Sequence, residues 1–318
     1  MSATRQVVRE RFAGRLTLPL IAAPMLRVSG PALVSACSRN GVIGAFPTSN
    51  CRTVEELDRW LSELSDALTP EAAPVCANLI MRSARLAQDL ECVVRHGVEL
   101  VITSVGSPQP VIAPLHEAGC VVFADVASIR HARKAAADGA DGLILLTAGA
   151  GGQTGWANGF AFARAVRAFF DGPIVMAGGV SDGVALLAAE VLGCDFAYMG
   201  TRFIATRESL ATDEYKAMLV DAELDDVQLT KAFTGLETNM LRPSIMAAGL
   251  DPAALPDRVS AESADAVHGT GGTGPARWRD VWSAGHSVSG VRSVLGVAEV
   301  IAQIRSEYET ARAGLARV

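Results

Sequence analysis

The chain has 318 residues, of which half are apolar, and its formal net charge at pH 7 is −6. This length accommodates either one large α/β barrel or two smaller domains. The acidic balance excludes the basic surface that binding to nucleic acid or an anionic membrane requires, so a small molecule is the expected partner. A cytoplasmic location is expected, because the polar start lacks a signal-peptide core and no apolar run is long enough to span a membrane.

The cysteines and lysines argue against two kinds of chemistry. The six cysteines are scattered, without a C-x-x-C pair or neighbouring histidines, so reduced thiols are expected rather than disulfides or a zinc site. Lys134, Lys216 and Lys231 fall in helical or polar segments. Schiff-base catalysis needs a desolvated lysine on a barrel strand, so an aldolase mechanism is disfavoured.

Short apolar runs alternate with amphipathic stretches from Leu18 to Thr201, which is the pattern of βα units around a parallel sheet. Helices are predicted between the runs, for example over Thr53–Leu68, which begins with a capping box, and over Ser128–Asp138. The predicted strands are Leu18–Ala22, Val42–Ala45, Val75–Leu79, Leu100–Thr103, Val121–Ala124, Gly142–Leu146, Ile174–Met176 and Phe196–Met199.

Eight strands separated by helices predict a closed (β/α)8 TIM barrel. A doubly wound sheet gives the same alternation, but it normally has G-x-G-x-x-G after the first strand, where this chain reads Ala-Ala-Pro-Met. The barrel is assigned to residues 1–205 and about 291–318. Residues of about 206–290 are predicted to form a mostly helical insertion or lid after strand eight, with a glycine-rich run from His268 to Pro275. A last helix is predicted from about Val297 to Ala313.

The active site of a TIM barrel lies at the carboxyl ends of the strands, so the residues that follow each apolar run are the candidates. They are Ala23, Pro24 and Met25 after the first strand, Asn78 near the end of the third, Ser104 after the fourth, Asp125 after the fifth, Thr147 to Trp156 after the sixth, Ala177, Gly178 and Gly179 after the seventh, and Gly200, Thr201 and Arg202 after the eighth.

The glycine turns after strands seven and eight are typical of a phosphate cradle built from backbone N–H groups. Glycine matters there because a side chain would keep the backbone away from the anion. The helix expected after Ser181-Asp182 would add its N-terminal dipole, and Thr201 would add a hydroxyl. Either turn alone could be an ordinary βα turn, but two of them one βα unit apart predict a phosphate site.

These successive motifs resemble those of the nitronate monooxygenase (2-nitropropane dioxygenase) family, in the same order and at spacings that suit a barrel. Related enoyl-thioester reductases of fatty-acid synthesis share the scaffold. The likeness extends over about Leu18 to Glu208. It rests on Ala23-Pro-Met25, Asn78, Ala148-Gly-Ala-Gly-Gly152, Ala177-Gly-Gly179-Val-Ser-Asp182-Gly183 and Met199-Gly-Thr-Arg-Phe203-Ile-Ala-Thr206.

The resemblance implies a TIM barrel that holds FMN without a covalent bond, with the isoalloxazine ring over the barrel mouth. The phosphate is expected at Gly178, Gly179, Gly200 and Thr201. Further cofactor contacts are expected from Ala23, Pro24, Met25, Asn78, Ser104, Asp125, Ala150, Gly151, Gly152, Ala177 and Met199.

Two residues depart from the family's pattern. Gln153 stands where the family's A-G-G-H-x-G motif has histidine, and Asp125 stands where the family usually has lysine. A carboxamide donates and accepts hydrogen bonds but takes up no proton near neutral pH, so Gln153 cannot be a general base. Asp125 removes a cation that could offset the charge of the phosphate or the reduced flavin. It could instead bond a ribityl hydroxyl or cap the next helix.

Gln153 and His286 are the candidate catalytic residues, the first as a hydrogen-bonding group and the second as a group delivered by the irregular late region. Tyr198 is predicted to pack between the barrel and its helices. Trp156 could wall the substrate pocket or plug a hydrophobic gap. Arg242 belongs either to a lid that reaches an anionic substrate or to a solvated connection.

The leading functional hypothesis is an FMN-dependent oxidoreductase that oxidises alkyl nitronates with oxygen, since an ionised nitronate needs no base to begin. The alternative is a flavin reductase of an activated double bond, such as an enoyl thioester, with NADH or NADPH as reductant. A third hypothesis is a non-catalytic barrel that binds a phosphorylated ligand. An inosinate-type dehydrogenase is set aside, because no cysteine lies between Cys120 and Cys194. Assembly into a homo-oligomer is left open.

Overall fold

The fold is known from a computed structural model that describes residues 3–256 and 279–315. Eight parallel strands close into a barrel in the order β1-β2-β3-β4-β5-β6-β8-β9. The predicted (β/α)8 barrel and its eight strands are thereby confirmed. The strands are β1 (Leu20–Ala22), β2 (Ile43–Pro47), β3 (Val75–Ile80), β4 (Leu100–Ser104), β5 (Val121–Val126), β6 (Gly142–Leu146), β8 (Ile174–Ala177) and β9 (Phe196–Met199).

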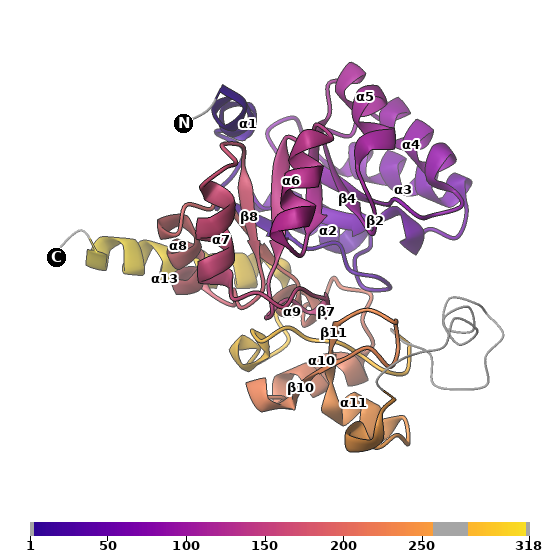
Figure 1. Ribbon diagram of the computed structural model, residues 1–318, viewed down its shortest axis with the longest axis vertical. Coiled ribbons are helices and arrows are strands. Elements are labelled where there is room, and N and C mark those ends of the chain that lie inside the picture. Colours follow the sequence, from indigo (N-terminus) through magenta and orange to yellow (C-terminus); the bar gives the residue numbers. More distant parts are fainter. Residues whose placement is uncertain (1–2, 257–278, 316–318) are drawn as a thin grey trace.

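Helices alternate with the strands and cover the outside of the barrel (Figure 1). Two of them begin as predicted, because the hydroxyls of Thr53 and Ser128 accept hydrogen bonds from backbone N–H groups of the first turn. The covering helices are α2 (Pro31–Arg39), α3 (Val54–Ala67), α4 (Leu86–Arg95), α5 (Gln109–Glu117), α6 (Ile129–Ala137), α7 (Gly159–Arg167), α8 (Gly183–Val191) and α13 (Val297–Leu315).

Alternation along the strands separates two apolar cores. One set of side chains fills the barrel interior, where Ile21, Ile102, Phe123 and Val175 belong to one buried cluster. The other set points outward and packs under the helices. Because successive strand residues face opposite sides, each polar residue near a strand end is directed either into the mouth or under a helix.

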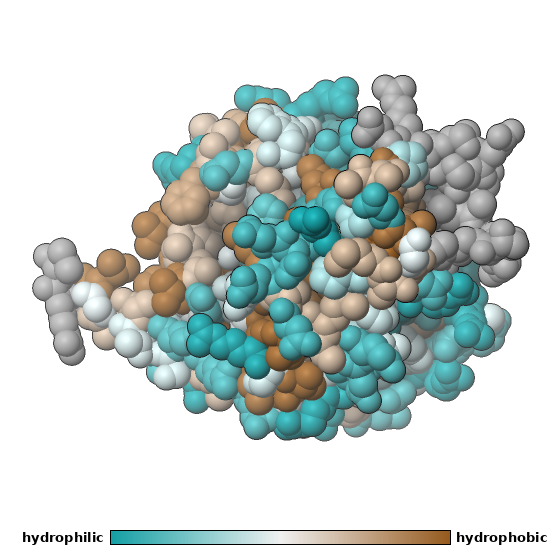
Figure 2. Space-filling model, turned by 90° about the horizontal axis from the view of Figure 1, so that it is seen from below, coloured by the Kyte–Doolittle hydropathy of each residue, from teal (hydrophilic) through white to brown (hydrophobic). Residues whose placement is uncertain are grey.

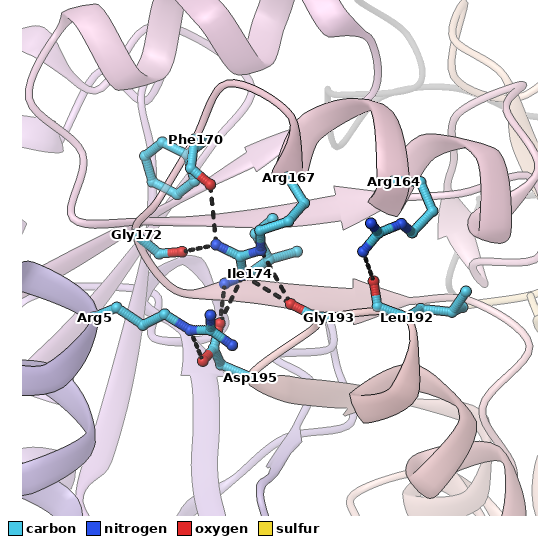
Figure 3. A network of polar contacts seen from close by, with 9 residues as sticks. All are labelled: Arg5, Arg164, Arg167, Phe170, Gly172, Ile174, Leu192, Gly193 and Asp195. Carbon is cyan, nitrogen blue, oxygen red and sulfur yellow. Dashed lines mark hydrogen bonds and ion pairs between the residues drawn. The ribbon is translucent and has the colours of Figure 1, made fainter. Parts of the chain in front are cut away.

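A helix that the sequence did not predict covers the amino-terminal end of the barrel. In α1 (Ala3–Phe12), Val8 and Phe12 are buried in the interior cluster. Arg5 on α1 pairs with Asp195, which also binds Arg167 on α7 and the backbone N–H of Ile174 (Figure 3). This end of the barrel is therefore closed by apolar packing and by a buried carboxylate with three partners.

The segment after β9 lies against the other end of the barrel (Figure 1). Helices predominate among its regular elements, as predicted, but it also contains two antiparallel strands that the sequence did not predict. The second of these pairs with β7 (Gly152–Gln153) in the loop after β6, which ties the insertion to the barrel. The elements are α9 (Thr201–Ile204), α10 (Asp213–Asp221), η2 (Leu224–Asp226), β10 (Val227–Thr230), β11 (Thr238–Leu241), α11 (Arg242–Ala247), η3 (Pro252–Ala254) and η4 (Val288–Gly290).

The glycine-rich run from His268 to Pro275 lies outside the described residues, so its prediction stays open. None of the helices in the described parts of the chain combines the length and the apolar character that crossing a membrane needs.

Candidate functional site at the carboxyl end of the barrel

The turn after β8 has the backbone geometry that the phosphate prediction requires. Gly178 and Gly179 both have positive φ, 115° and 76°. A Cβ on Gly178 would lie 2.4 Å from Oγ1 of Thr147, so glycine is needed there for packing against the loop after β6. A Cβ on Gly179 would meet no atom within 4 Å, so this glycine borders open space.

The turn after β9 supplies a second group of donors. Gly200 is the N-cap residue of the short helix α9, which begins at Thr201. The backbone N–H groups of Gly179 and Thr201 have no backbone partner among the residues that the structure describes. The Thr201 hydroxyl accepts a hydrogen bond from Gly285 N at 2.9 Å, which leaves its own hydrogen to donate to an anion.

The two turns are brought together by a late segment of the chain. The backbone of Gly149, after β6, lies beside Gly179, and its carbonyl accepts a hydrogen bond from His286 N at 3.0 Å. Gly285, which binds Thr201, precedes His286. The predicted phosphate residues therefore surround one region of the mouth, and the exposed His286 side chain lies at its border. The catalytic role of His286 stays a prediction.

The expectation that the N-terminus of α8 attracts the phosphate is wrong, because this helix end is already occupied. Asp182 caps it by accepting a hydrogen bond from Ala185 N at 2.8 Å. Glu307 on α13 accepts another from Gly183 N at 3.0 Å. Two carboxylates satisfy two of the donors of this helix end and offset the positive end of its dipole, so the predicted phosphate site is left to the strand-end turns.

Asn239 holds the loop after β6 in place and was not singled out from the sequence. This β11 side chain is 1% exposed. Its amide donates to the carbonyls of Ala148 at 2.8 Å and Ala150 at 2.7 Å. These carbonyls belong to residues 91 and 89 positions earlier in the chain, so no local pattern could have indicated the contact.

The predicted loop residues occupy the rim of the mouth. Ala150 is buried, Gly151 is exposed, and a Cβ on Gly151 would lie 2.7 Å from Gly285 N. Gly152 has a positive φ of 69° and opens β7. Gln153 pairs with Thr238 of β11 and is partly exposed, and its carboxamide makes no hydrogen bond to any described residue.

The first loop lines the opposite side. Ala23 N donates to the carbonyl of Met199 at 2.9 Å, and Met25 N donates to Ser29 Oγ at 3.0 Å. Met25 lies next to Gly200, where a Cβ would be 3.4 Å from its Sδ atom. Ala23 is buried, whereas Pro24 and Met25 are partly exposed, so this loop presents apolar atoms close to the phosphate turn.

Polar side chains at the ends of β3, β4 and β5 form a floor inside the mouth. Asn78 Nδ2 donates to Ser104 Oγ at 3.1 Å and to the Ile102 carbonyl at 3.2 Å. Asp125 is partly exposed as a residue, but its Oδ1 atom is buried and has no hydrogen-bond partner among the described residues. Burial raises the pKa of Asp125 to about 7. This carboxyl does not cap α6, because Ser128 does.

Two side chains of β9 do not point where the sequence predicted. One was expected under the helices, and the other was expected to contact the cofactor. Tyr198 packs against the interior cluster rather than under the helices, because it pairs in register with Ile21 of β1, which points inward. Met199 packs in the outer cluster, so only its backbone is available at the mouth. Ala177 belongs to the interior cluster. Burial raises the pKa of Tyr198 well above its ordinary value.

Trp156 and Arg242 lie at the surface. Trp156 is 75% exposed, so it does not plug a hydrophobic gap. Arg242 is exposed at the start of α11. Figure 2 is the view from below Figure 1, where the insertion lies, and it shows hydrophilic residues near the middle of this face among scattered hydrophobic ones. Both residues remain candidates for contact with a substrate that extends beyond the mouth.

One cysteine lies near a histidine, which the sequence did not indicate. Asp58 on α3, Cys92 on α4 and His96, which caps the end of α4, bring potential metal-ligand atoms within 4.8 Å of one another. Arg95 Nη2 lies 2.6 Å from Asp58 Oδ1 and 3.6 Å from Cys92 Sγ. The guanidinium of Arg95 therefore already provides a positive charge beside these residues, where a metal ion would otherwise be expected.

A sequence model of the nitronate monooxygenase family matches residues 77–307. The chain belongs to the nitronate monooxygenase family. The resemblance found in the sequence implies FMN as the cofactor of this family. The match begins within β3 and covers the later strands and the insertion, whereas β1, β2 and the loop that follows β1 lie outside it.

The curated relatives of this chain are named for more than one activity. The chain is 32% identical over 231 residues to "(3aS,4S,5R,7aS)-5-hydroxy-7a-methyl-1-oxo-octahydro-1H-indene-4-carboxyl-CoA dehydrogenase" of Mycobacterium tuberculosis, which covers 72% of the chain and 64% of that protein. The match to a second such dehydrogenase, from Rhodococcus jostii, also spans 64% of its length. A nitronate monooxygenase of Paraburkholderia phytofirmans is 28% identical, with 92% of each chain covered.

Solved structures show the same barrel. FabK of Thermotoga maritima superposes with a TM-score of 0.79 over 97% of both chains at 23% identity. A nitroalkane oxidase of Streptomyces ansochromogenes superposes with a TM-score of 0.78 at 25% identity, covering 95% of this chain and 98% of that one. The insertion is part of these alignments, since nearly the whole chain is covered.

The residues at the mouth fit FMN. Gly179 borders open space and, with Thr201, offers donors without a backbone partner, which suits the phosphate. The floor beside them combines the polar pair of Asn78 and Ser104 with the unpartnered oxygen of Asp125, which suits the heteroatoms of the ring. Each side of the mouth therefore presents groups complementary to one part of the cofactor.

Proposed function

We propose that the chain binds FMN at the carboxyl end of the barrel and oxidises alkyl nitronates with oxygen. Gly178, Gly179, Gly200 and Thr201 hold the phosphate, and the ring lies over the floor that contains Asn78, Ser104 and Asp125. When bound, FMN accepts electrons from the substrate and passes them to oxygen. The residues of this chain supply position, hydrogen bonds and exclusion of water.

This proposal rests on the side chain that β7 places at the rim of the mouth. The site there presents Gln153, a side chain with a free carboxamide and no acid–base function near neutral pH. An alkyl nitronate is already ionised and needs no deprotonation. A carboxamide N–H can donate a hydrogen bond to one of its oxygens.

A dehydrogenase or reductase that acts on a coenzyme A thioester is the second candidate. It is favoured by the 32% identity to a relative whose name specifies a carboxyl-CoA substrate. Gln153 suits this reaction as well, because its N–H can polarise a thioester carbonyl without proton transfer. This candidate requires NADH or NADPH as the electron donor or the corresponding oxidised form as acceptor.

Anaerobic stopped-flow mixing of the FMN-loaded protein with propyl-2-nitronate, NADH or NADPH distinguishes the two candidates. Bleaching of the flavin absorbance by the nitronate, with neither nicotinamide effective, is the expected result. Fast bleaching by a nicotinamide without any by the nitronate would instead establish the reductase. The variant Gln153→Ala is expected to slow the nitronate reaction by about tenfold to a hundredfold, since one oxyanion donor is lost.

Three further predictions follow from the sequence, and the structure does not test them. The substrate is a small molecule, and neither nucleic acid nor a membrane is a partner. The chain functions in the cytoplasm, and it can assemble with copies of itself. Fractionation of cells and light scattering of the purified protein would check the last two.

A further inference from the structure

Asp125 differs from the other polar side chains of the mouth, because one of its oxygens is buried without a partner. Asn78 and Ser104 bond to each other, and Thr201 bonds to Gly285. In the described residues, the buried side-chain oxygens without a hydrogen bond are Asp125 Oδ1 and Ser38 Oγ. A buried acceptor without a donor is costly unless something else supplies the hydrogen bond.

No positive charge compensates Asp125 in the part of the chain that the structure describes. Its carboxyl group forms no ion pair there. The titratable groups that face it are Cys76 on β3 and Tyr198 on β9. Burial raises the pKa of both groups, and the nearby Asp125 adds a smaller effect in the same direction. Both are neutral near pH 7, so they do not stabilise a carboxylate.

The carboxyl group therefore favours its neutral form. Below it lie the apolar residues of the interior cluster, such as Ile144 and Phe123. Removal of a carboxylate from water raises its pKa, and here burial is the cause of a value of about 7. A neutral carboxyl group donates one hydrogen bond and accepts others, whereas a carboxylate only accepts.

We propose that Asp125 is a proton-bearing residue of the FMN site, whose neutral carboxyl group hydrogen-bonds the isoalloxazine ring, so that FMN binds to the protonated form of this side chain. The inference rests on the proposed function, since it requires FMN over the floor of the mouth. It assigns to Asp125 the contact that the family's usual lysine would make through a permanent charge. FMN affinity then depends on pH through this one residue.

The dissociation constant of FMN tests the inference. It is measured by quenching of free FMN fluorescence from about pH 5.5 to about pH 9, for the natural protein and for Asp125→Asn, whose amide is a neutral donor at every pH. The phosphate of FMN also titrates, but equally in both proteins, so the ratio of the two constants isolates Asp125.

The ratio of the natural to the variant constant is expected to be flat below about pH 7 and to rise about tenfold for each pH unit above it. A flat ratio with tight binding by both proteins would overturn the inference but leave the proposed function standing. Failure of the natural protein to bind FMN at any pH would overturn both. Asp66→Asn, at an exposed aspartate on α3, is the matched control and should follow the natural protein.

Infrared difference spectra of the FMN-free protein supply a readout that needs no ligand. The carbonyl band of a protonated carboxyl group is expected to disappear as the pH rises through about 7, and Asp125→Asn should lack this change. If Asp125→Asn fails to fold, Asp125→Ser takes its place, since serine is also neutral over this range. Absence of the band in the natural protein at low pH would contradict a proton on Asp125.

Discussion

The two ends of the barrel each contain an aspartate in a buried setting, and their surroundings are opposite. At the amino-terminal end, Asp195 binds two arginines and a backbone N–H, as Figure 3 shows. At the carboxyl end, Asp125 Oδ1 has no partner among the described residues. The first carboxylate joins α1 and α7 to the barrel. The second forms no hydrogen bond or ion pair with the residues that the structure describes, and it faces the mouth. This is the distribution expected when stability and ligand binding are separated along a TIM barrel.

The same substitution at the two aspartates should give opposite results, and the larger effect is at Asp195. Asp195→Asn removes the buried carboxylate that Arg5 and Arg167 share, so the free energy of unfolding at pH 7 should fall by about 3 kcal/mol. Urea unfolding measures this change. Asp66→Asn is the surface control, with an expected change of about 0.5 kcal/mol or less. Equal stability of the Asp195 variant and the natural protein would show that the network does not hold the amino-terminal end.

Asp125 should make stability fall as the pH rises. Its folded pKa of about 7 lies above the value of about 4 for an unfolded aspartate. The folded chain therefore binds more protons than the unfolded chain between about pH 4 and pH 7, and the stability from this group is lost as the pH rises through this window. Asp125→Asn should lack this loss, so relative to the natural protein it should gain about 2 kcal/mol from pH 5 to pH 8. Urea unfolding at these pH values measures the change. The assignment would be contradicted if the free energy of unfolding changed by the same amount in the variant and in the natural protein.

The two glycines after β8 have different roles, since one is needed for packing and the other borders the predicted phosphate position. Gly179→Ala should cost only about 1 kcal/mol of stability, from the positive φ of this residue, because its Cβ enters open space. FMN affinity should nevertheless fall by more than about tenfold, since the methyl group occupies the anion's position. Gly178→Ala is the contrast and should unfold more easily, because its Cβ would meet Ala150 N at 2.5 Å. Undiminished FMN binding by Gly179→Ala would place the phosphate elsewhere.

The smallest expected effect lies away from both ends. Thr53→Ala removes the cap of α3, whose hydroxyl accepts a hydrogen bond from Glu56 N, and should cost about 1 kcal/mol. FMN affinity should stay unchanged, because α3 lies outside the barrel. A change in FMN binding in this variant would mean that stability and binding are not separable in this protein.

Much of the site was predictable because strand-end positions follow from sequence order. Once the apolar runs were assigned to strands, residues such as Asn78, Ser104 and Asp125 had to lie near one another at the mouth. The predicted dipole of α8 failed, because Glu307 reaches that helix end from more than a hundred positions away. Tyr198 was assigned to the wrong face because its direction depends on its pairing with Ile21.

The sequence by itself determined the eight strands, the helices between them, the glycine turns and the departure of Gln153 and Asp125 from the family's pattern. These features depend on local periodicity, backbone freedom and residue chemistry. The tertiary structure alone decided that α1 closes the amino-terminal end, that Asn239 holds the loop after β6, and that Asp125 Oδ1 is left without a partner. Hydrogen-bond satisfaction and burial arise from contacts between distant parts of the chain, so no local pattern specifies them.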